Sequence, residues 1–373
     1  MNKKVLFITT QDMHDKYGNG GAKVSQKNFQ LIEEYFGETN TVLCTFSNKT
    51  TEKFQNGEIV FRRAESDMQK IVSALCGCKI YLPWDERAIL KCIKNQQIDL
   101  LFIDGSVLGR LAKFKTKYRT IVFYHNVEAD YAWNKVKNEG VQYIPSYLAS
   151  KYNDKMGTKA DIIIGLNRRD SERLFQIYGR KMDYLLPVTF TDVFDLNRVK
   201  KQYDRELMFM GSFFSANQVS IEWFIKEVMP GLNNIVLNIV GKDFEIMKDT
   251  YEQVHNVHVI GSVRELDEYY YRHAAVVMPI ISGAGMKVKT AEAMMFGRVI
   301  FASNEALEGY DVEGVKDVYR CNSAEEYITA INDFFNRENY RGYSESVRKL
   351  FVEKFESNKV KIDFFKMIEN IIA

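Results

Sequence analysis

The chain has 373 residues, of which 46% are apolar and 27% charged, and its formal net charge is +2. This length suits two domains or one large one, and the balance excludes a disordered or fibrous chain. No apolar run approaches the roughly 18 residues of a membrane-spanning helix. The five cysteines are scattered without metal-ligand spacing, so we expect a reduced, cytoplasmic protein.

The charge is divided unevenly along the chain. Residues 1–185 hold 29 Lys and Arg against 21 Asp and Glu, whereas residues 186–373 hold 22 against 28. A basic first half favours an anionic acceptor or peripheral association with the inner, anionic face of a membrane, and a solvated lysine-rich surface is the alternative. No nucleic-acid-binding motif accompanies these charges, so we expect no nucleic-acid partner.

Apolar strand patterns and helical patterns alternate along the first half. We expect strands over 4–10, 41–46, 58–61, 100–103, 120–124 and 161–165, and helices over 67–75, 85–95, 144–159 and 167–178. Such alternation predicts a doubly wound, mostly parallel sheet. Gly20 and Gly21 follow the first strand, and His125 follows the strand over 120–124, so both lie at the carboxyl edge where α/β proteins bind ligands. The alternative for Gly20 and Gly21 is a tight turn without function, and the alternative for His125 is a histidine that only caps the end of a strand.

The pattern begins again after Leu186-Pro187. We expect strands that end before Gly211, Gly241 and Gly261, a helix over 265–273, and a strand over 274–278. Residues 350–373 predict one long amphipathic helix. We therefore expect three parts: 1–185, a first α/β domain; 186–355, a second α/β domain; and 356–373, a terminal helix that packs across to the first domain.

The stretch from Pro279 to Gly297 joins a strand, a glycine-containing turn and a helix that begins near Met286. The unpaired N–H groups and the dipole of a helix start favour an anion. Lys287 and Lys289 add two cations, and Glu292 adds a carboxylate that can accept hydrogen bonds from vicinal hydroxyls. A surface turn followed by a packed helix is the alternative.

Several enzyme signatures are absent from the sequence. It contains no His-Glu-x-x-His, no Gly-x-Ser-x-Gly, no Walker loop and no Asp-x-Asp. We therefore expect no metal and no cofactor. A bound diphosphate would be neutralised by backbone N–H groups, a helix dipole and basic side chains.

Nearly the full chain resembles the two-domain GT-B glycosyltransferases, and most closely the retaining family 4, or group 1, transferases. The resemblance is carried by Gly20-Gly21, by 125–128, by Gly211 with the residues around it, by the loops at Gly241 and Gly261, and above all by 279–297. It implies two Rossmann-like domains that face each other across a cleft, an acceptor-side domain over 1–185 and a nucleotide-sugar-binding domain over 186–355. It also implies a nucleotide-diphosphate sugar as co-substrate.

The resemblance assigns roles to individual positions. Glu292 would bind the ribose, and His125 would lie near the donor sugar. The residues that would contact the rest of the donor are Gly20, Gly21, Gly211, Gly241, Ser262, Val263, Arg264, Gly283, Ala284, Gly285, Met286, Lys287 and Val288. Ala284 stands where the family signature has its first glutamate, and the Arg and Lys that often follow the Gly211 position are missing. We expect His125 and Lys287 to be the catalytic residues. Lys287, with Lys289 as the second candidate, would take over part of the diphosphate binding.

The sequence thus predicts a retaining, metal-independent glycosyltransferase of polysaccharide biosynthesis. It would move a sugar from the nucleotide donor to a glycan or lipid-linked glycan. Two alternatives remain open: a nucleotide-sugar epimerase of the same fold, and a non-catalytic subunit that binds a sugar nucleotide.

Overall fold

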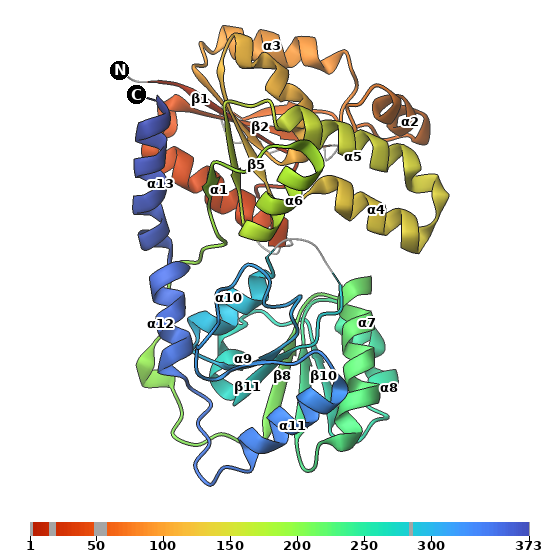
Figure 1. The fold of residues 1–373 in the computed structure, drawn as a ribbon, viewed down its shortest axis with the longest axis vertical. Helices are drawn as coiled ribbons and strands as arrows, with labels where there is room; N and C mark the ends of the chain where they lie inside the picture. The colour runs from red at the N-terminus through yellow and green to blue at the C-terminus, as the bar shows by residue number, and fades with distance from the viewer. Residues whose placement is uncertain (1–2, 15–19, 48–57, 283–285, 373) are drawn as a thin grey trace. The chain divides into compact units, whose positions relative to one another are not determined.

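The computed structural model describes residues 3–14, 20–47, 58–282 and 286–372. The chain forms two compact units, one made of residues 1–187 with 361–373 and the other of residues 188–360. Each unit is a parallel β-sheet with helices on its faces (Figure 1). Both units are therefore α/β and Rossmann-like.

The sheet of the first unit has the strand order β3-β2-β1-β4-β5-β6-β7, and every neighbouring pair is parallel. β1 and β4 are buried along their whole length, as expected for central strands covered on both faces. The strands are β1 (Val5–Thr9), β2 (Thr41–Phe46), β3 (Ile59–Phe61), β4 (Leu100–Asp104), β5 (Arg119–Tyr124), β6 (Ile162–Gly165) and β7 (Tyr184–Leu185).

The helices of the first unit connect these strands and cover the sheet. They are α1 (Gly20–Phe36), α2 (Asp67–Leu75), α3 (Asp85–Asn95), α4 (Glu128–Glu139), α5 (Ile144–Gly157) and α6 (Arg168–Tyr178), with 3₁₀ turns over Glu38–Asn40, Ser106–Thr116 and Val141–Tyr143. Local caps explain several of the starts. Ser66 and Gln69 form a capping box at α2, and the Asn167 side chain accepts the Asp170 N–H at α6.

The sheet of the second unit has the order β10-β9-β8-β11-β12-β13, again with parallel neighbours only. Its strands are β8 (Glu206–Met210), β9 (Val236–Val240), β10 (Val257–Gly261), β11 (Ala275–Met278), β12 (Val299–Ala302) and β13 (Val318–Arg320). β8 lies between β9 and β11, so the order reverses direction beside it. Ligands of open α/β sheets bind at the carboxyl ends of strands at such a reversal.

The helices of the second unit are α7 (Ser215–Trp223), α8 (Lys248–Tyr251), α9 (Asp267–Arg272), α10 (Val288–Met295), α11 (Ala324–Phe335) and α12 (Glu345–Lys354). Short turns fill the connections: a π-helical turn at Phe224–Val228 and 3₁₀ turns at Leu196–Arg198, Met229–Gly231 and Phe244–Met247. A buried Arg298 fastens the end of α10 to its surroundings. Its guanidinium donates to the Phe296 and His273 carbonyls and to the Tyr203 hydroxyl.

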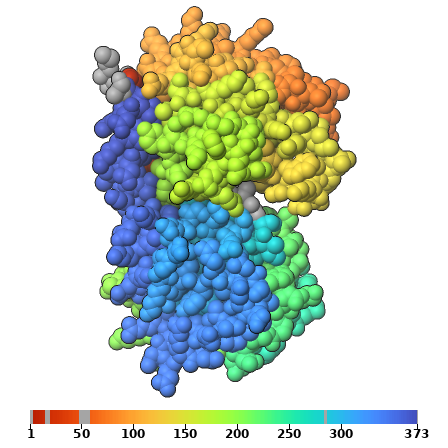
Figure 2. All heavy atoms as spheres, viewed as in Figure 1, coloured from red at the N-terminus to blue at the C-terminus, as the bar shows by residue number. Residues whose placement is uncertain are grey.

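The terminal region differs from the single helix expected over 350–373. It forms α12 and a separate α13 (Ser357–Ile372). The break lies where Phe190 and Glu356 form an isolated β-bridge, so backbone pairing interrupts the helix. The later part of α13 packs on α1 through the Lys361–Glu34 ion pair and the rings of Phe365 and Tyr35, and Figure 2 shows its dark-blue atoms along one side of the molecule.

Two further segments differ from the sequence-based expectation. Neither α4 nor the long 3₁₀ segment over Ser106–Thr116 was among the expected helices. Both segments pack around α5. Gly109 makes this possible, because an added Cβ would lie 2.2 Å from the Asn153 carbonyl oxygen. Such a close backbone approach leaves room only for glycine.

Candidate functional site

Three glycines in the second unit follow neighbouring parallel strands. The Gly211 N–H donates to the Val240 carbonyl at 3.0 Å, and the Gly241 N–H donates to the Gly261 carbonyl at 2.8 Å. Gly241 has φ +149°, and a Cβ there would lie 1.6 Å from the Gly211 oxygen. The loops after β8, β9 and β10 are therefore held together by their backbones, which meet too closely for side chains.

Lys289, in the first turn of α10, reaches this cluster of loops. Its Nζ donates to Asn217 Oδ1 at 2.8 Å and lies 4.7 Å from the centre of the Phe209 ring. The Asn217 amide in turn donates to the Ser212 carbonyl at 2.8 Å. Burial, followed by the charge of Lys287, lowers the pKa of Lys289 to about 7, while Glu292 opposes the shift.

Lys287 lies directly before α10, but its ammonium already has an acidic partner. Its Nζ is 2.7 Å from Glu305 Oε1, and both side chains are largely buried. The Lys287 carbonyl accepts from the Tyr310 hydroxyl at 2.8 Å. Lys287 is thus built into the support of α10, and Lys289 is the lysine whose Nζ lies among the strand ends.

The remaining residues of this stretch lie on α10 or just before it. Met286 is buried, Val288 is the first residue of α10, and Glu292 is buried about one turn into the helix. Burial, and to a smaller extent the charge of Glu292, raises the pKa of Tyr270. Gly283, Ala284 and Gly285 lie outside the described residues.

The loop after β10 places Ser262 in a hydrogen-bond network. Its hydroxyl donates to Glu245 Oε1 at 2.9 Å and accepts from the Asp243 N–H at 3.1 Å, and its own N–H donates to Glu245 Oε2. Val263 is partly buried and Arg264 is exposed. The network fixes the loop from Gly261 to Arg264 next to Gly241. The resemblance assigns this loop to the border of the base.

His125 of the first unit lies at the carboxyl edge, as expected, and a residue that the sequence analysis did not single out lies beside it. Asp104, at the end of β4, is 1% exposed, and its Oδ1 is 3.2 Å from His125 Nε2. Thr9, at the end of β1, and Asn28, on α1, donate to the same carboxylate. The signal for Asp104 was its place directly after an apolar strand, the same signal that identified His125.

Gly20 and Gly21 are the first residues of α1. The same helix carries Ser25 and Asn28, both buried, toward Asp104 and His125. The glycine pair and the Asp104–His125 pair therefore share one edge of the first sheet.

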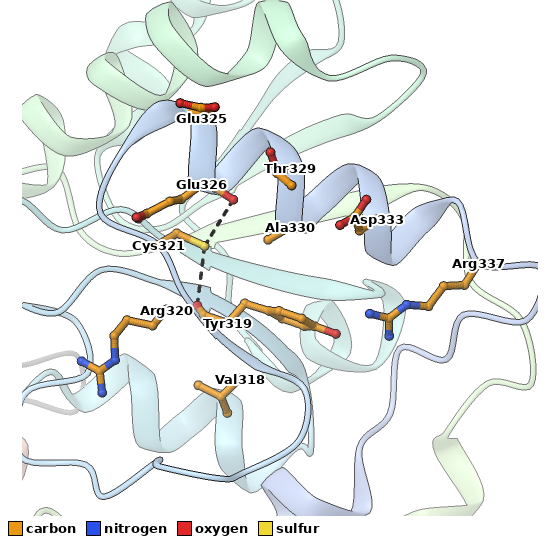
Figure 3. A pocket seen from close by; sticks show the side chains of 10 residues that line it. All are labelled: Val318, Tyr319, Arg320, Cys321, Glu325, Glu326, Thr329, Ala330, Asp333 and Arg337. Atoms are coloured by element: carbon orange, nitrogen blue, oxygen red, sulfur yellow. Dashed lines mark hydrogen bonds between the residues drawn. The ribbon is translucent and has the colours of Figure 1, made fainter.

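The surface of the second unit also has an open hollow of about 560 Å³, away from these residues. It is lined by β13 and α11, with Arg320 and Arg337 toward its two ends (Figure 3). The Cys321 thiol on its wall contacts the carbonyls of Tyr319 and Glu326. None of its lining residues belongs to the site that the resemblance implies.

Neither a metal-binding cluster nor a membrane-spanning helix is found in the described part of the chain. Among residues 3–14, 20–47, 58–282 and 286–372, no group of three or more His, Cys, Asp and Glu is placed to hold a metal ion. Over the same ranges, no helix combines the length and the apolar character needed to cross a bilayer.

Comparison with known proteins finds one family match and several structures of the same fold. Residues 204–337, within the second unit, match the family model for glycosyl transferases group 1. No curated protein matches the chain.

Several solved structures share the whole fold. Sucrose-phosphate synthase from Thermosynechococcus elongatus has a TM-score of 0.73 at 13% identity, over 100% of this chain and 99% of that one. HepE of Anabaena, in complex with UDP, has a TM-score of 0.68 at 12% identity, over 98% and 100%. WaaG, a glycosyltransferase involved in lipopolysaccharide biosynthesis, has a TM-score of 0.65 at 14% identity, over 98% of this chain and 99% of that one. The chain therefore has the two-domain GT-B fold, and residues 204–337 of its second unit are similar to the glycosyl transferases group 1.

Proposed function

We propose that this protein is a glycosyltransferase that takes a sugar from a nucleotide-diphosphate donor. The observation that carries the proposal is the arrangement around Lys289. Three glycine loops, joined backbone to backbone, meet at the strand ends, and a buried ammonium lies among them at the start of α10. A helix start and a cation at the ends of parallel strands suit a diphosphate.

Several features support the nucleotide part of the donor. Glu292 lies about one turn into α10, on the same helix as Lys289, where the resemblance puts the carboxylate that binds the ribose. HepE, which shares the fold, has been solved with UDP and with UDP-glucose. UDP-sugars are therefore the first donors to test. The acceptor that we propose is a glycan or lipid-linked glycan.

The reaction that we propose retains the anomeric configuration and uses no metal. The acceptor oxygen bonds to the anomeric carbon as the bond from that carbon to the diphosphate breaks. The departing phosphate oxygen takes the acceptor's proton on the same face, as the family resemblance implies. The contribution of the protein is to orient both substrates and to stabilise the leaving diphosphate, with Lys289 as its cation and Lys287 as a supporting one.

A thermal-shift screen of nucleotide sugars tests the donor site. A ligand at 100 times its Kd stabilises the native state by about 2.7 kcal/mol, which moves Tm by a few degrees. Binding should be lost in Glu292→Gln and kept in Glu325→Gln, a matched substitution on α11. The absence of a shift with every nucleotide would refute the proposal.

Product analysis separates transfer from its alternatives. NMR of the product with an acceptor panel should show a new glycosidic bond of retained configuration, unchanged by EDTA. An altered sugar epimer with donor alone would identify an epimerase. Saturable binding without turnover on any acceptor would identify a non-catalytic subunit.

We further propose that the first unit touches an anionic membrane surface from the cytoplasmic side. Its α2 and α5 expose apolar side chains at helical spacing: Met68, Ile71 and Leu75 on α2, at 76%, 53% and 77%, and Ile144, Leu148 and Tyr152 on α5. The Tyr152 ring lies against Gly77, two residues after the end of α2, so the two helices adjoin (Figure 1). The basic balance of residues 1–185 complements anionic lipid.

Sedimentation with vesicles tests this surface. The protein should pellet with phosphatidylglycerol vesicles and less with phosphatidylcholine, and Met68→Gln combined with Leu75→Gln should reduce pelleting. Ile246→Gln, at a 69% exposed position of the second unit, is the matched control. Wild-type protein that stays in the supernatant with anionic vesicles would contradict the proposal.

A further inference from the structure

The carboxylate of Asp104 is fully enclosed and surrounded by hydrogen-bond donors. Oδ2 accepts from the Thr9 hydroxyl at 3.0 Å, and Oδ1 accepts from the Asn28 amide at 3.0 Å. The Thr9 hydroxyl itself accepts from the Gln11 N–H at 3.1 Å, which directs its own hydrogen toward Asp104. These donors fix the carboxylate in one orientation.

The enclosed carboxylate is ionised. Burial by itself would raise the pKa of Asp104, but His125 and the hydrogen bonds from Ser25 and Asn28 outweigh it and hold the pKa below its ordinary value. An ionised carboxylate is an acceptor only. The ring nitrogen of His125 that faces it, Nε2 at 3.2 Å, must therefore be the one that carries hydrogen.

The other ring nitrogen then has a free lone pair when the imidazole is neutral. Nδ1 is buried and has no hydrogen-bond partner among the described residues. The ring is held from the side by Phe123, whose centroid lies 4.9 Å away in an edge-to-face arrangement. A buried acceptor without a partner is costly, so Nδ1 is suited to a hydroxyl that arrives with a ligand.

We propose that Asp104 is a positioning residue: it holds His125 with the hydrogen on Nε2 and leaves Nδ1 to accept a hydrogen bond from a hydroxyl of the sugar substrate. The identity of the ligand rests on the transfer reaction proposed above, whereas the state of the imidazole does not. A carboxylate that fixes the tautomer and the ring orientation of a histidine is a general device of active sites.

NMR of the full chain labelled with ¹⁵N-histidine tests the tautomer directly. The chain has five histidines, and the signal missing from His125→Gln identifies His125. We expect its hydrogen on Nε2, in slow exchange with water, at a pH where imidazole is neutral. Asp104→Ala should speed this exchange strongly. A hydrogen on Nδ1, or an unchanged exchange rate in Asp104→Ala, would overturn the proposal.

Two further variants keep the test independent of folding. Asp104→Asn preserves volume and one acceptor oxygen but removes the charge, so its Nε2 hydrogen should exchange at an intermediate rate. Asp154→Asn changes another buried carboxylate of the same unit, which accepts from the Ala129 N–H at 2.8 Å, and should leave the His125 signal unchanged. An Asp104→Asn rate equal to wild type, or a changed signal in Asp154→Asn, would speak against Asp104.

Kinetics tests the consequence for the substrate. Loss of a charge-assisted hydrogen bond should lower kcat in Asp104→Ala about ten- to a hundredfold. The Kd for the nucleotide alone should stay unchanged, because the proposed nucleotide contacts lie on the second unit. An unchanged kcat would overturn the substrate part. If wild type turns over no donor, the transfer proposal fails while the NMR result still decides the role of Asp104.

Discussion

Binding of a nucleotide sugar should be coupled to protonation of Lys289. The pKa of this lysine is lowered to about 7 by burial and by the charge of Lys287. A diphosphate beside Nζ would favour the ammonium form and raise that pKa. Binding above pH 7 should therefore take up a proton, and affinity should fall as pH rises.

The magnitude follows from that pKa. With a value of about 7, roughly three quarters of the Lys289 side chains carry a proton at pH 6.5 and about 3% at pH 8.5. If only the ammonium form binds well, Kd should rise about 25-fold between these two pH values. A bound-state pKa below 8.5 would make the change smaller.

Isothermal titration calorimetry measures both quantities. An intact nucleotide sugar is the suitable ligand because its diphosphate lacks the terminal phosphate ionisation near pH 6. Titrations at pH 8 in two buffers of different ionisation enthalpy give the number of protons taken up, which should approach one. Lys289→Met should bind weakly without proton uptake, and Lys289→Arg keeps a charge at all these pH values.

The same lysine predicts the pH dependence of the free protein. Between about pH 7 and its ordinary value of 10.5, the unfolded chain binds the Lys289 proton and the native state does not. The free energy of unfolding should therefore rise with pH across this window, and Lys289→Met should flatten the rise. Equal wild-type Kd values at pH 6.5 and 8.5, or the same pH dependence in Lys289→Met, would refute the assignment.

Three substitutions test the packing of the two units by urea unfolding. Gly241→Ala would force a Cβ to within 1.6 Å of the Gly211 oxygen and should cost about 3 kcal/mol or more, and a loss below about 1 would contradict the close approach. Arg298→Leu leaves the buried Tyr203 hydroxyl and two carbonyls without their hydrogen-bond donor and should lower the free energy of unfolding by about 3 kcal/mol. An unchanged unfolding midpoint would argue against these hydrogen bonds. Burial, and after it the charge of Glu128, raises the pKa of Asp154 to about 7, so the protonated Asp154 carboxyl stabilises the native state at low pH and this stabilisation is lost as pH rises from about 4 through 7. Asp154→Asn should therefore be more stable than wild type at pH 8, by about 1 to 4 kcal/mol. A Tm difference between the two proteins that does not depend on pH would exclude the titration of Asp154 as the cause.

Much of the fold could be predicted from local pattern. Apolar runs followed by glycine or polar residues located most strands of both sheets, although the short β7 and β13 were not expected. The ranges expected for α2 and α3 are those observed. Alternation of strand and helix is enough to predict parallel sheets, because parallel strands need crossover connections. The α4 helix was missed because its polar sequence, with Asn134 and Asn138 in its middle, carries little apolar periodicity.

The candidate site divides in the same way. Glycines, His125 and Glu292 stand in recognisable sequence surroundings, so the resemblance could point to them. The partners of the lysines could not be predicted, since Lys287 meets Glu305 eighteen residues away and Lys289 meets Asn217 seventy-two residues away. Lys287 and Lys289, with a single residue between them, look equivalent in the sequence, yet their side chains project from the start of α10 in different directions.

The sequence by itself determined the two-unit α/β architecture, the strand ends at which we expect ligands to bind, and the residue types of the anion-binding stretch proposed at the start of α10. These properties follow from local periodicity, glycine placement and the chemistry of helix termini. Only the tertiary structure decided which polar groups share an environment: Lys289 rather than Lys287 among the strand ends, and Asp104 beside His125. The physical reason is that burial and hydrogen-bond partners arise from contacts between segments distant in the chain, and these contacts set protonation state and tautomer.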